Sequence, residues 1–223
     1  MHRAPIIAAS ALALLALAAC NQSYRRNGPA AVNPAINPWF AAATSNDPAL
    51  LSAAATTNAD PNAHETRDYS TPLHIAATAG NTDAIRVLLA AGAKPNALDE
   101  DGRTPLMLAC HRLRTPAALA LIAAPTDLAL SDRQRQTALM FAARQGDLET
   151  VRAMIAANAP LNAQRADGWT ALHLAARQGH ADIARALKQA GANPTLPDRR
   201  GRTAIDVANA SRNRAVADVL IDG

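Results

Sequence analysis

The chain repeats itself at a fixed interval. Five threonines, each opening a near copy of the same unit, stand 33 residues apart, at Thr71, Thr104, Thr137, Thr170 and Thr203. Repetition at a constant interval of about 20 to 50 residues is typical of proteins in which each unit packs only against its neighbours. A unit of this size buries its apolar face only when others stack on it, so a stable core needs several units in a row. The interval therefore favours an elongated stack over a globular domain with one central core.

The residues within each unit predict two short helices. The first copy begins with Thr-Pro-Leu-His-Ile-Ala-Ala at Thr71, and the fourth begins with Thr-Ala-Leu-His-Leu-Ala-Ala at Thr170. A threonine hydroxyl caps the first turn of a helix, and proline is tolerated as the first helical residue. Apolar residues at helical spacing, such as Ile85, Leu88 and Leu89, predict the second helix. The turn between the helices requires backbone freedom, which glycines supply at Gly80, Gly146 and Gly179.

These units resemble ankyrin repeats, whose period is about 33 residues. The resemblance implies an all-α solenoid of helix-turn-helix units with short β-hairpin-like loops between them. The dipeptides Asp101-Gly102 and Asp167-Gly168 stand where these loops would reverse direction. The predicted units are a degenerate N-terminal capping repeat at 38–65, ankyrin repeats at 66–98, 99–131, 132–164 and 165–197, and a C-terminal capping repeat at 198–223.

Two segments depart from the pattern. Trp39 and Phe40 precede the first complete unit, and we expect them to cover the exposed end of the stack. In the divergent unit 99–131, Leu113 replaces the turn glycine. We therefore expect this unit to have a distorted turn, with Pro116 starting its second helix.

Residues 1–19 have the composition of a signal peptide. An uncharged apolar stretch follows Arg3 and ends in Leu17-Ala18-Ala19-Cys20. The stretch is shorter than the roughly 20 apolar residues that a transmembrane helix needs. It has the length of a signal-peptide core that ends in small residues. An ordinary secretory signal cleaved beside a cysteine is one reading of this segment.

The Leu-Ala-Ala-Cys sequence also resembles the lipobox of bacterial lipoproteins. That resemblance implies that the Cys20 thiol receives a diacylglycerol, that the mature chain begins there, and that lipid holds it at a membrane. Residues 20–37 would then be the lipidated cysteine and a flexible tether, because they show no periodic apolar pattern. The expected location is the Gram-negative cell envelope, facing the periplasm. Asn21 favours the outer over the inner membrane, because the usual retention residue of inner-membrane lipoproteins in enteric bacteria is aspartate.

The sequence does not indicate catalysis. It has no glycine-rich phosphate loop, no His-Glu-x-x-His motif and no Cys-x-x-Cys pair. His74 and His173 occupy the same repeat position three units apart, too far to share a metal ion. The ankyrin resemblance implies that such histidines join adjacent units through hydrogen bonds. Cys110 stands at an alanine position, and we expect a small buried residue rather than a reactive thiol. We therefore predict no enzyme activity, no metal and no cofactor.

Arginine dominates the predicted binding surface. In the ankyrin family, ligands usually meet the concave face, which is formed by loop tips and the exposed side of the inner helices. Those positions carry many arginines here and almost no carboxylates. Arginine binds carboxylate and phosphate groups through two parallel hydrogen bonds, and tryptophan and arginine are enriched at the energetic centres of interfaces. The predicted partner-binding residues are Arg103, Arg112, Arg133, Arg144, Trp169, Arg177, Arg200 and Arg202.

Together these features predict a monomeric, lipid-anchored scaffold or inhibitor that binds an acidic protein. Two narrower functions stay open: an immunity-type inhibitor of a periplasmic toxin or lipase, and an accessory factor for a periplasmic enzyme. The formal net charge of +4 also fits anionic lipid head groups, whereas an exported chain rarely meets nucleic acid. A general preference for arginine is the remaining alternative, because Lys94 and Lys188 are the only lysines.

Overall fold

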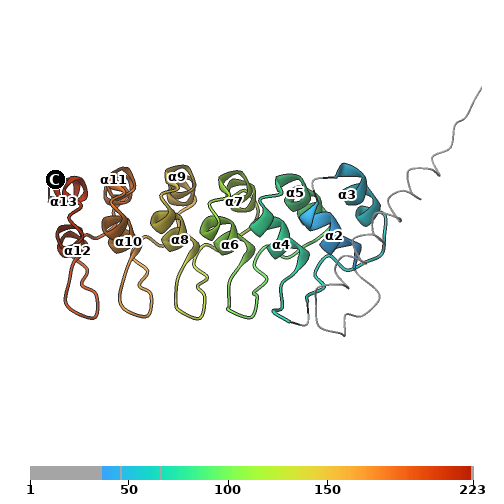
Figure 1. The fold of residues 1–223 in the computed structure, drawn as a ribbon, viewed down its shortest axis with the longest axis horizontal. Helices are drawn as coiled ribbons and strands as arrows, with labels where there is room; N and C mark the ends of the chain where they lie inside the picture. Colours follow the sequence, from blue (N-terminus) through green and yellow to red (C-terminus); the bar gives the residue numbers. More distant parts are fainter. Residues whose placement is uncertain (1–36, 46, 66, 222–223) are drawn as a thin grey trace, which may run out of the picture.

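The computed structural model describes residues 37–45, 47–65 and 67–221, which form twelve helices arranged as pairs in a row (Figure 1). The pairs are α2 (Pro38–Thr44) with α3 (Pro48–Ala55), α4 (Pro72–Ala79) with α5 (Thr82–Ala90), α6 (Pro105–His111) with α7 (Thr115–Ile122), α8 (Ala138–Gln145) with α9 (Leu148–Ala156), α10 (Ala171–Gln178) with α11 (Ala181–Gln189), and α12 (Ala204–Ala210) with α13 (Arg214–Ile221). The predicted signal peptide, Cys20 and most of the tether lie outside the described residues. None of these twelve helices has the length and apolar character needed to cross a membrane.

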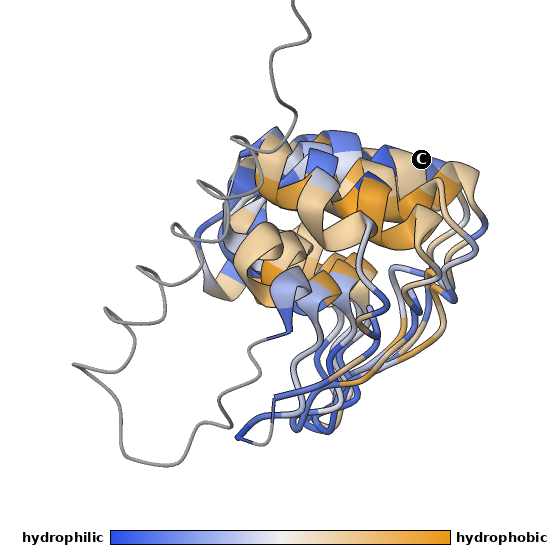
Figure 2. Ribbon diagram, turned by 90° about the vertical axis from the view of Figure 1, so that its right-hand side faces the viewer, coloured by the Kyte–Doolittle hydropathy of each residue, from blue (hydrophilic) through white to orange (hydrophobic). Residues whose placement is uncertain are grey.

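The helices form two layers (Figure 1). The first helix of each pair lies in an inner layer beside the loops, and the second lies in an outer layer. Each inner helix packs against the next inner helix, and each outer helix packs against the next outer helix. Figure 2, viewed along the stack, shows the loops together on one side of the helices. We call the surface formed by these loops and the exposed side of the inner helices the concave face.

Alanine and leucine build the core. One alanine position of the inner helix is fully buried in every complete unit, at Ala76, Ala109, Ala142, Ala175 and Ala208. Small side chains at this position let neighbouring inner helices approach closely, while the larger apolar side chains fill the space between the two layers. Leu139 and Leu172 are typical of these, since each is 1 % exposed.

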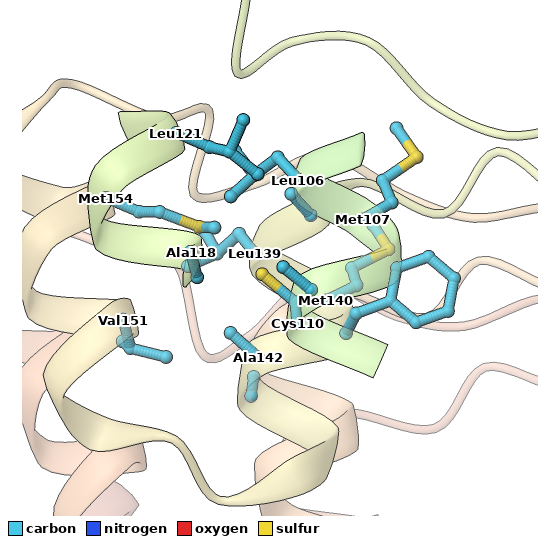
Figure 3. Close-up of a cluster of buried hydrophobic side chains, with 14 of the residues drawn as sticks. Leu106, Met107, Cys110, Ala118, Leu121, Leu139, Met140, Ala142, Val151 and Met154 are labelled. Carbon is cyan, nitrogen blue, oxygen red and sulfur yellow. The ribbon is translucent and has the colours of Figure 1, made fainter. Parts of the chain in front are cut away.

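Cys110 belongs to this core. Figure 3 shows its side chain in a cluster with Ala118, Leu139 and other residues of α6 to α9. The residue is fully buried, and burial raises the pKa of its thiol well above the ordinary range. Cys110 is therefore a small buried residue, as its alanine position predicts.

The N-terminal helix pair covers one end of the stack. Helix α2 packs against α4, and Trp39 on α2 is only 2 % exposed. The indole Nε1 of Trp39 donates a hydrogen bond of 3.1 Å to the carbonyl oxygen of Ala59. Phe40 is half-buried beside it. The expected covering role of Trp39 is confirmed.

The divergent turn keeps the path of the others. Leu113 adopts φ 54°, close to the φ values of 80° at Gly80 and 83° at Gly146. The predicted distortion is therefore confined to the end of α6, which stops at His111. An L-residue other than glycine is disfavoured in this left-handed conformation by about 1 kcal/mol or more. Leu113 therefore strains the backbone of the turn, but the chain follows the same course as in the other units. Helix α7 begins at Thr115, one residue before the predicted start at Pro116.

Backbone hydrogen bonds join each loop to the next at one repeated position. The amide of Arg133 donates to the carbonyl of Asp101, and the amide of Arg199 donates to the carbonyl of Asp167, each at 3.0 Å. Equivalent bonds join Glu100 to Asp68 and Ala166 to Gln134. The loops therefore form an ordered row, although the only β-bridge in the described part of the chain joins Ser131 and Thr137.

Two histidines also connect neighbouring units. The Nε2 atom of His74 lies 3.0 Å from the carbonyl oxygen of Arg103, and Nε2 of His173 lies 3.1 Å from that of Arg202. Their Nδ1 atoms face the threonines that precede the inner helices, so both ring nitrogens have partners. This confirms the predicted role of His74 and His173 in joining adjacent units.

Candidate partner-binding face

A buried aspartate organises the loops that carry the arginines. The Oδ1 atom of Asp198 accepts hydrogen bonds from the amides of Arg200 and Arg202, at 2.8 and 2.9 Å. Its Oδ2 atom accepts from the guanidinium of Arg202, with Nη2 at 2.8 Å. The same arrangement, with a side chain four residues later bound to the carboxylate, recurs at Asp99 with Arg103 and at Asp132 with Gln136.

This arrangement corrects the prediction of a face almost free of carboxylates. Arg103 forms ion pairs with both Asp99 and Asp101, at 2.8 and 3.0 Å. Arg202 is paired with Asp198. These two arginines are committed to their own loops, because withdrawing either would leave the charge of a buried aspartate uncompensated. Only the remaining arginines of the face are available to neutralise a partner.

The loop 165–169 lacks both the aspartate and the partner side chain four residues later. Arg165 stands where the neighbouring loops have aspartate, and Trp169 stands where they have arginine or glutamine. Asp167 supplies the missing carboxylate: its Oδ1 and Oδ2 accept hydrogen bonds from Nε and Nη2 of Arg165, at 2.7 and 2.6 Å. The hydrogen bonds from Arg165 hold the pKa of Asp167 below its usual range.

Trp169, one of the predicted partner-binding residues, is buried. Only 7 % of the residue is exposed, and its indole Nε1 donates a hydrogen bond of 3.1 Å to Oδ2 of Asp198 in the next loop. Three guanidinium groups stand over its ring, with their central carbons 5.0, 5.6 and 5.8 Å from the ring centroid, at Arg165, Arg177 and Arg202. Trp169 therefore supports arginines through cation–π contacts, and the arginines form the outer surface.

A hollow of about 380 Å³ lies beside Trp169. Its charged lining consists of five arginines and two aspartates, at Arg165, Arg177, Arg199, Arg200, Arg202, Asp167 and Asp198. Arg165 and Arg202 are paired with these aspartates. The other three, Arg177, Arg199 and Arg200, are exposed and form no ion pair with any described residue. The hollow thus presents three uncompensated positive charges.

Asp198 stays ionised despite its burial. Burial alone would raise the pKa of its carboxyl. The hydrogen bonds from the Arg202 amide and guanidinium, the Arg200 amide and the Trp169 indole outweigh burial and hold the pKa well below the usual range. A fixed negative charge therefore orients both Trp169 and Arg202 at the base of the hollow.

Comparison with known families identifies the repeats. A family model described as ankyrin repeats, in three copies, matches residues 39–132, 114–198 and 139–223, which together span well over half of the chain. The chain belongs to the ankyrin repeat family. A search of curated proteins finds no significant match. The prediction of an all-α ankyrin-repeat solenoid is confirmed, and ankyrin repeats are generally protein–protein interaction modules without catalytic activity.

The other predicted residues of the ankyrin face lie toward its middle. Arg112 and Arg133 are exposed and form no ion pair with a described residue. Arg144 is half-buried, and its guanidinium stands 5.2 Å from the ring centroid of Phe141. Burial, followed by the charge of Arg165, lowers the pKa of Arg144. Helix α8, which carries Phe141 and Arg144, packs against α10, which carries Arg177 of the hollow.

Sequence reasoning does not identify Phe141 or Arg165 as parts of the face. Phe141 lies within an apolar helical run and carries no signal of its own. Arg165 could be found, because it breaks the period set by Asp99, Asp132 and Asp198. Among the residues that the structure describes, no group of three or more histidine, cysteine, aspartate or glutamate side chains could hold a metal ion.

Proposed function

We propose that the chain is a protein-binding ankyrin module whose concave face receives an acidic partner, acting as a scaffold or inhibitor. The observation that carries this proposal is the row of arginines at the ends of successive inner helices. Arg112 follows α6, Arg144 lies in the last turn of α8, and Arg177 lies in the last turn of α10. The three form no ion pair with any described residue, so their charges are available to a partner. Acidic groups on that partner would match them in sign.

A cation in the last turn of a helix also has a structural benefit, since it offsets the helix dipole by about 0.3–1 kcal/mol. Charge alone therefore does not establish a binding face. The stacking of Arg144 on Phe141 and of Arg177 on Trp169 favours binding, because contact with an aromatic ring restricts the orientation of each guanidinium. A fixed cation loses less side-chain entropy when it meets a partner.

The proposed setting is the periplasmic side of a Gram-negative envelope. The lipobox-like Leu17-Ala18-Ala19-Cys20 supports attachment through lipid on Cys20, with the outer membrane favoured over the inner one. An anchored module of this kind would capture proteins that pass or reside near the membrane surface.

The test is capture of a partner from solubilised membranes, followed by mass spectrometry, with two charge-matched variants. Arg144→Glu with Arg177→Glu reverses two charges of the concave face, and Arg86→Glu with Arg152→Glu reverses two charges on α5 and α9. We expect an acidic protein that the wild type and the outer-helix variant retain, and that the concave-face variant loses. Equal retention by both variants would contradict the proposal.

A further inference from the structure

We propose that the hollow beside Trp169 seats the carboxylate of an aspartate or glutamate side chain from the partner. This inference rests on the proposed protein-binding function and assigns it one contact point. The hollow lies between the 165–169 loop with α10 and the 199–202 loop with α12, so two successive repeats contribute to it.

The exchange of loop residues explains why the hollow occurs at this place. In the 99–103 and 198–202 loops, an aspartate and an arginine neutralise each other. In the 165–169 loop, Arg165 replaces the aspartate, and the indole of Trp169 reaches across to Asp198 instead. The exchange raises the formal charge of this residue pair from zero to +1, because the aspartate is lost. It also makes Asp198 of the next loop the hydrogen-bond acceptor for the indole. Arg177 then stands over that ring without a carboxylate partner among the described residues.

The charges of the hollow favour an anion. Five arginines against two aspartates leave a net charge of +3 around about 380 Å³. Both aspartates already accept hydrogen bonds from Arg165 or Arg202, so they do not compete for Arg177, Arg199 and Arg200. A carboxylate accepts two parallel hydrogen bonds from a guanidinium, and such charge-assisted pairs are among the stronger hydrogen bonds.

The apolar part of the lining favours a side chain over a bare anion. Val207 and Ala210 of α12 line the hollow together with the arginines. The methylene groups of a glutamate or aspartate would contact these residues while the carboxylate faces the guanidinium groups. An isolated phosphate would leave this apolar surface uncovered. The position of the hollow at one end of the arginine row fits a partner segment that lies along the concave face.

The experiment titrates the purified chain with two synthetic peptides, hexaglutamate and hexaglutamine. A Trp39→Phe background leaves Trp169 as the single tryptophan, so its fluorescence reports on the hollow. We expect hexaglutamate to change this fluorescence and hexaglutamine to leave it unchanged. Arg199→Glu with Arg200→Glu should weaken hexaglutamate binding by about tenfold or more, because charges in direct contact are reversed.

Two controls separate a site from general positive charge. Arg86→Glu with Arg152→Glu changes the net charge equally and should weaken binding by less than about threefold, because exposed charges more than about 10 Å away are screened. Arg177→Lys keeps the charge but removes the planar fork, and it should weaken binding several-fold. Equal losses from both double variants, or an unchanged Trp169 fluorescence, would overturn the proposal. Displacement of the peptide by inorganic phosphate at matched ionic strength would also overturn it, in favour of a phosphate site.

The same variants distinguish the two proposals. If a captured acidic protein needs Arg144 but binds the Arg199→Glu with Arg200→Glu variant normally, the hollow is not the contact point and the binding function stands. If hexaglutamate binds in the hollow but no protein depends on the concave face, the proposed function fails and the carboxylate site stands.

Discussion

Replacing Trp169 with phenylalanine removes one N–H donor and keeps an aromatic ring. The lost hydrogen bond ends on an ionised acceptor, Asp198, and bonds to charged groups contribute about 1.5–3 kcal/mol. Asp198 keeps its bonds to Arg200 and Arg202, so we expect a loss at the lower end, about 1.5 kcal/mol of unfolding free energy.

The chain offers a matched control for this change. Trp39 also donates from Nε1 over 3.1 Å, but its acceptor is the neutral carbonyl of Ala59. Trp39→Phe should cost about 0.5–1.5 kcal/mol, the usual range for a neutral pair. Trp169→Ala should cost about 3–5 kcal/mol, since it empties a buried aromatic site as well.

Urea denaturation of the three variants measures these differences, and its pH dependence tests the charge of the acceptor. The pKa of Asp198 is lower in the folded state, so the carboxylate contributes stability above its unfolded pKa and loses it as pH falls through the folded pKa. The excess cost of Trp169→Phe over Trp39→Phe should therefore be present at neutral pH and shrink in acid. Equal costs for the two variants at neutral pH would refute the assigned role of Asp198.

Three further predictions concern the anchor, the core and the histidines. Cys20→Ser should abolish membrane association, measured by fractionation after a high-salt wash, because no thiol remains to carry lipid; protein that still sediments with membranes would contradict the lipoprotein assignment. Leu172→Ala should cost about 2–5 kcal/mol as a buried leucine truncation, and exposed Arg185→Ala should cost less than about 0.5 kcal/mol, so equal effects in chemical denaturation would contradict the assigned faces. Burial lowers the pKa of His74 and His173, so stability should be complete above about pH 6.5 and decrease as pH falls below it, because the unfolded chain binds these protons more readily. Replacing both histidines with glutamine should reduce the change in unfolding free energy between neutral and mildly acidic pH, and an unchanged pH dependence would disprove this role.

The fold could be predicted from the sequence because its determinants are local and repeated. The same threonine, turn glycine and apolar helix positions recur in each unit, so every unit predicts the same structure. A single departure such as Leu113 does not change the fold, because the neighbouring units fix the positions of its helices. The αL conformation of Leu113 follows from the packing of α6 and α7 into the same positions as the other pairs. Local residue preference alone would predict a different turn.

The site could be predicted only in outline. The arginines are visible in the sequence, but which of them are neutralised depends on contacts between loops. Trp169 donates a hydrogen bond to Asp198, 29 residues later, and this predicted partner-binding residue is buried. Single-sequence patterns do not specify how far a side chain extends across a unit boundary, so exposure at such positions must come from the structure.

The regular stacking of the inner helices also sets a length scale for recognition. Packed helices lie about 8–10 Å apart, so cations at equivalent positions of α8 and α10 are spaced by about the same distance. A peptide in the polyproline II conformation advances about 3.1 Å per residue with three residues per turn, so acidic residues at every third position would lie on one face and meet successive cations. Each additional match is an intramolecular event and multiplies affinity through effective concentration. A partner would then be selected by the spacing of its acidic residues along the chain, and two peptides of equal charge but different spacing would bind with different strengths.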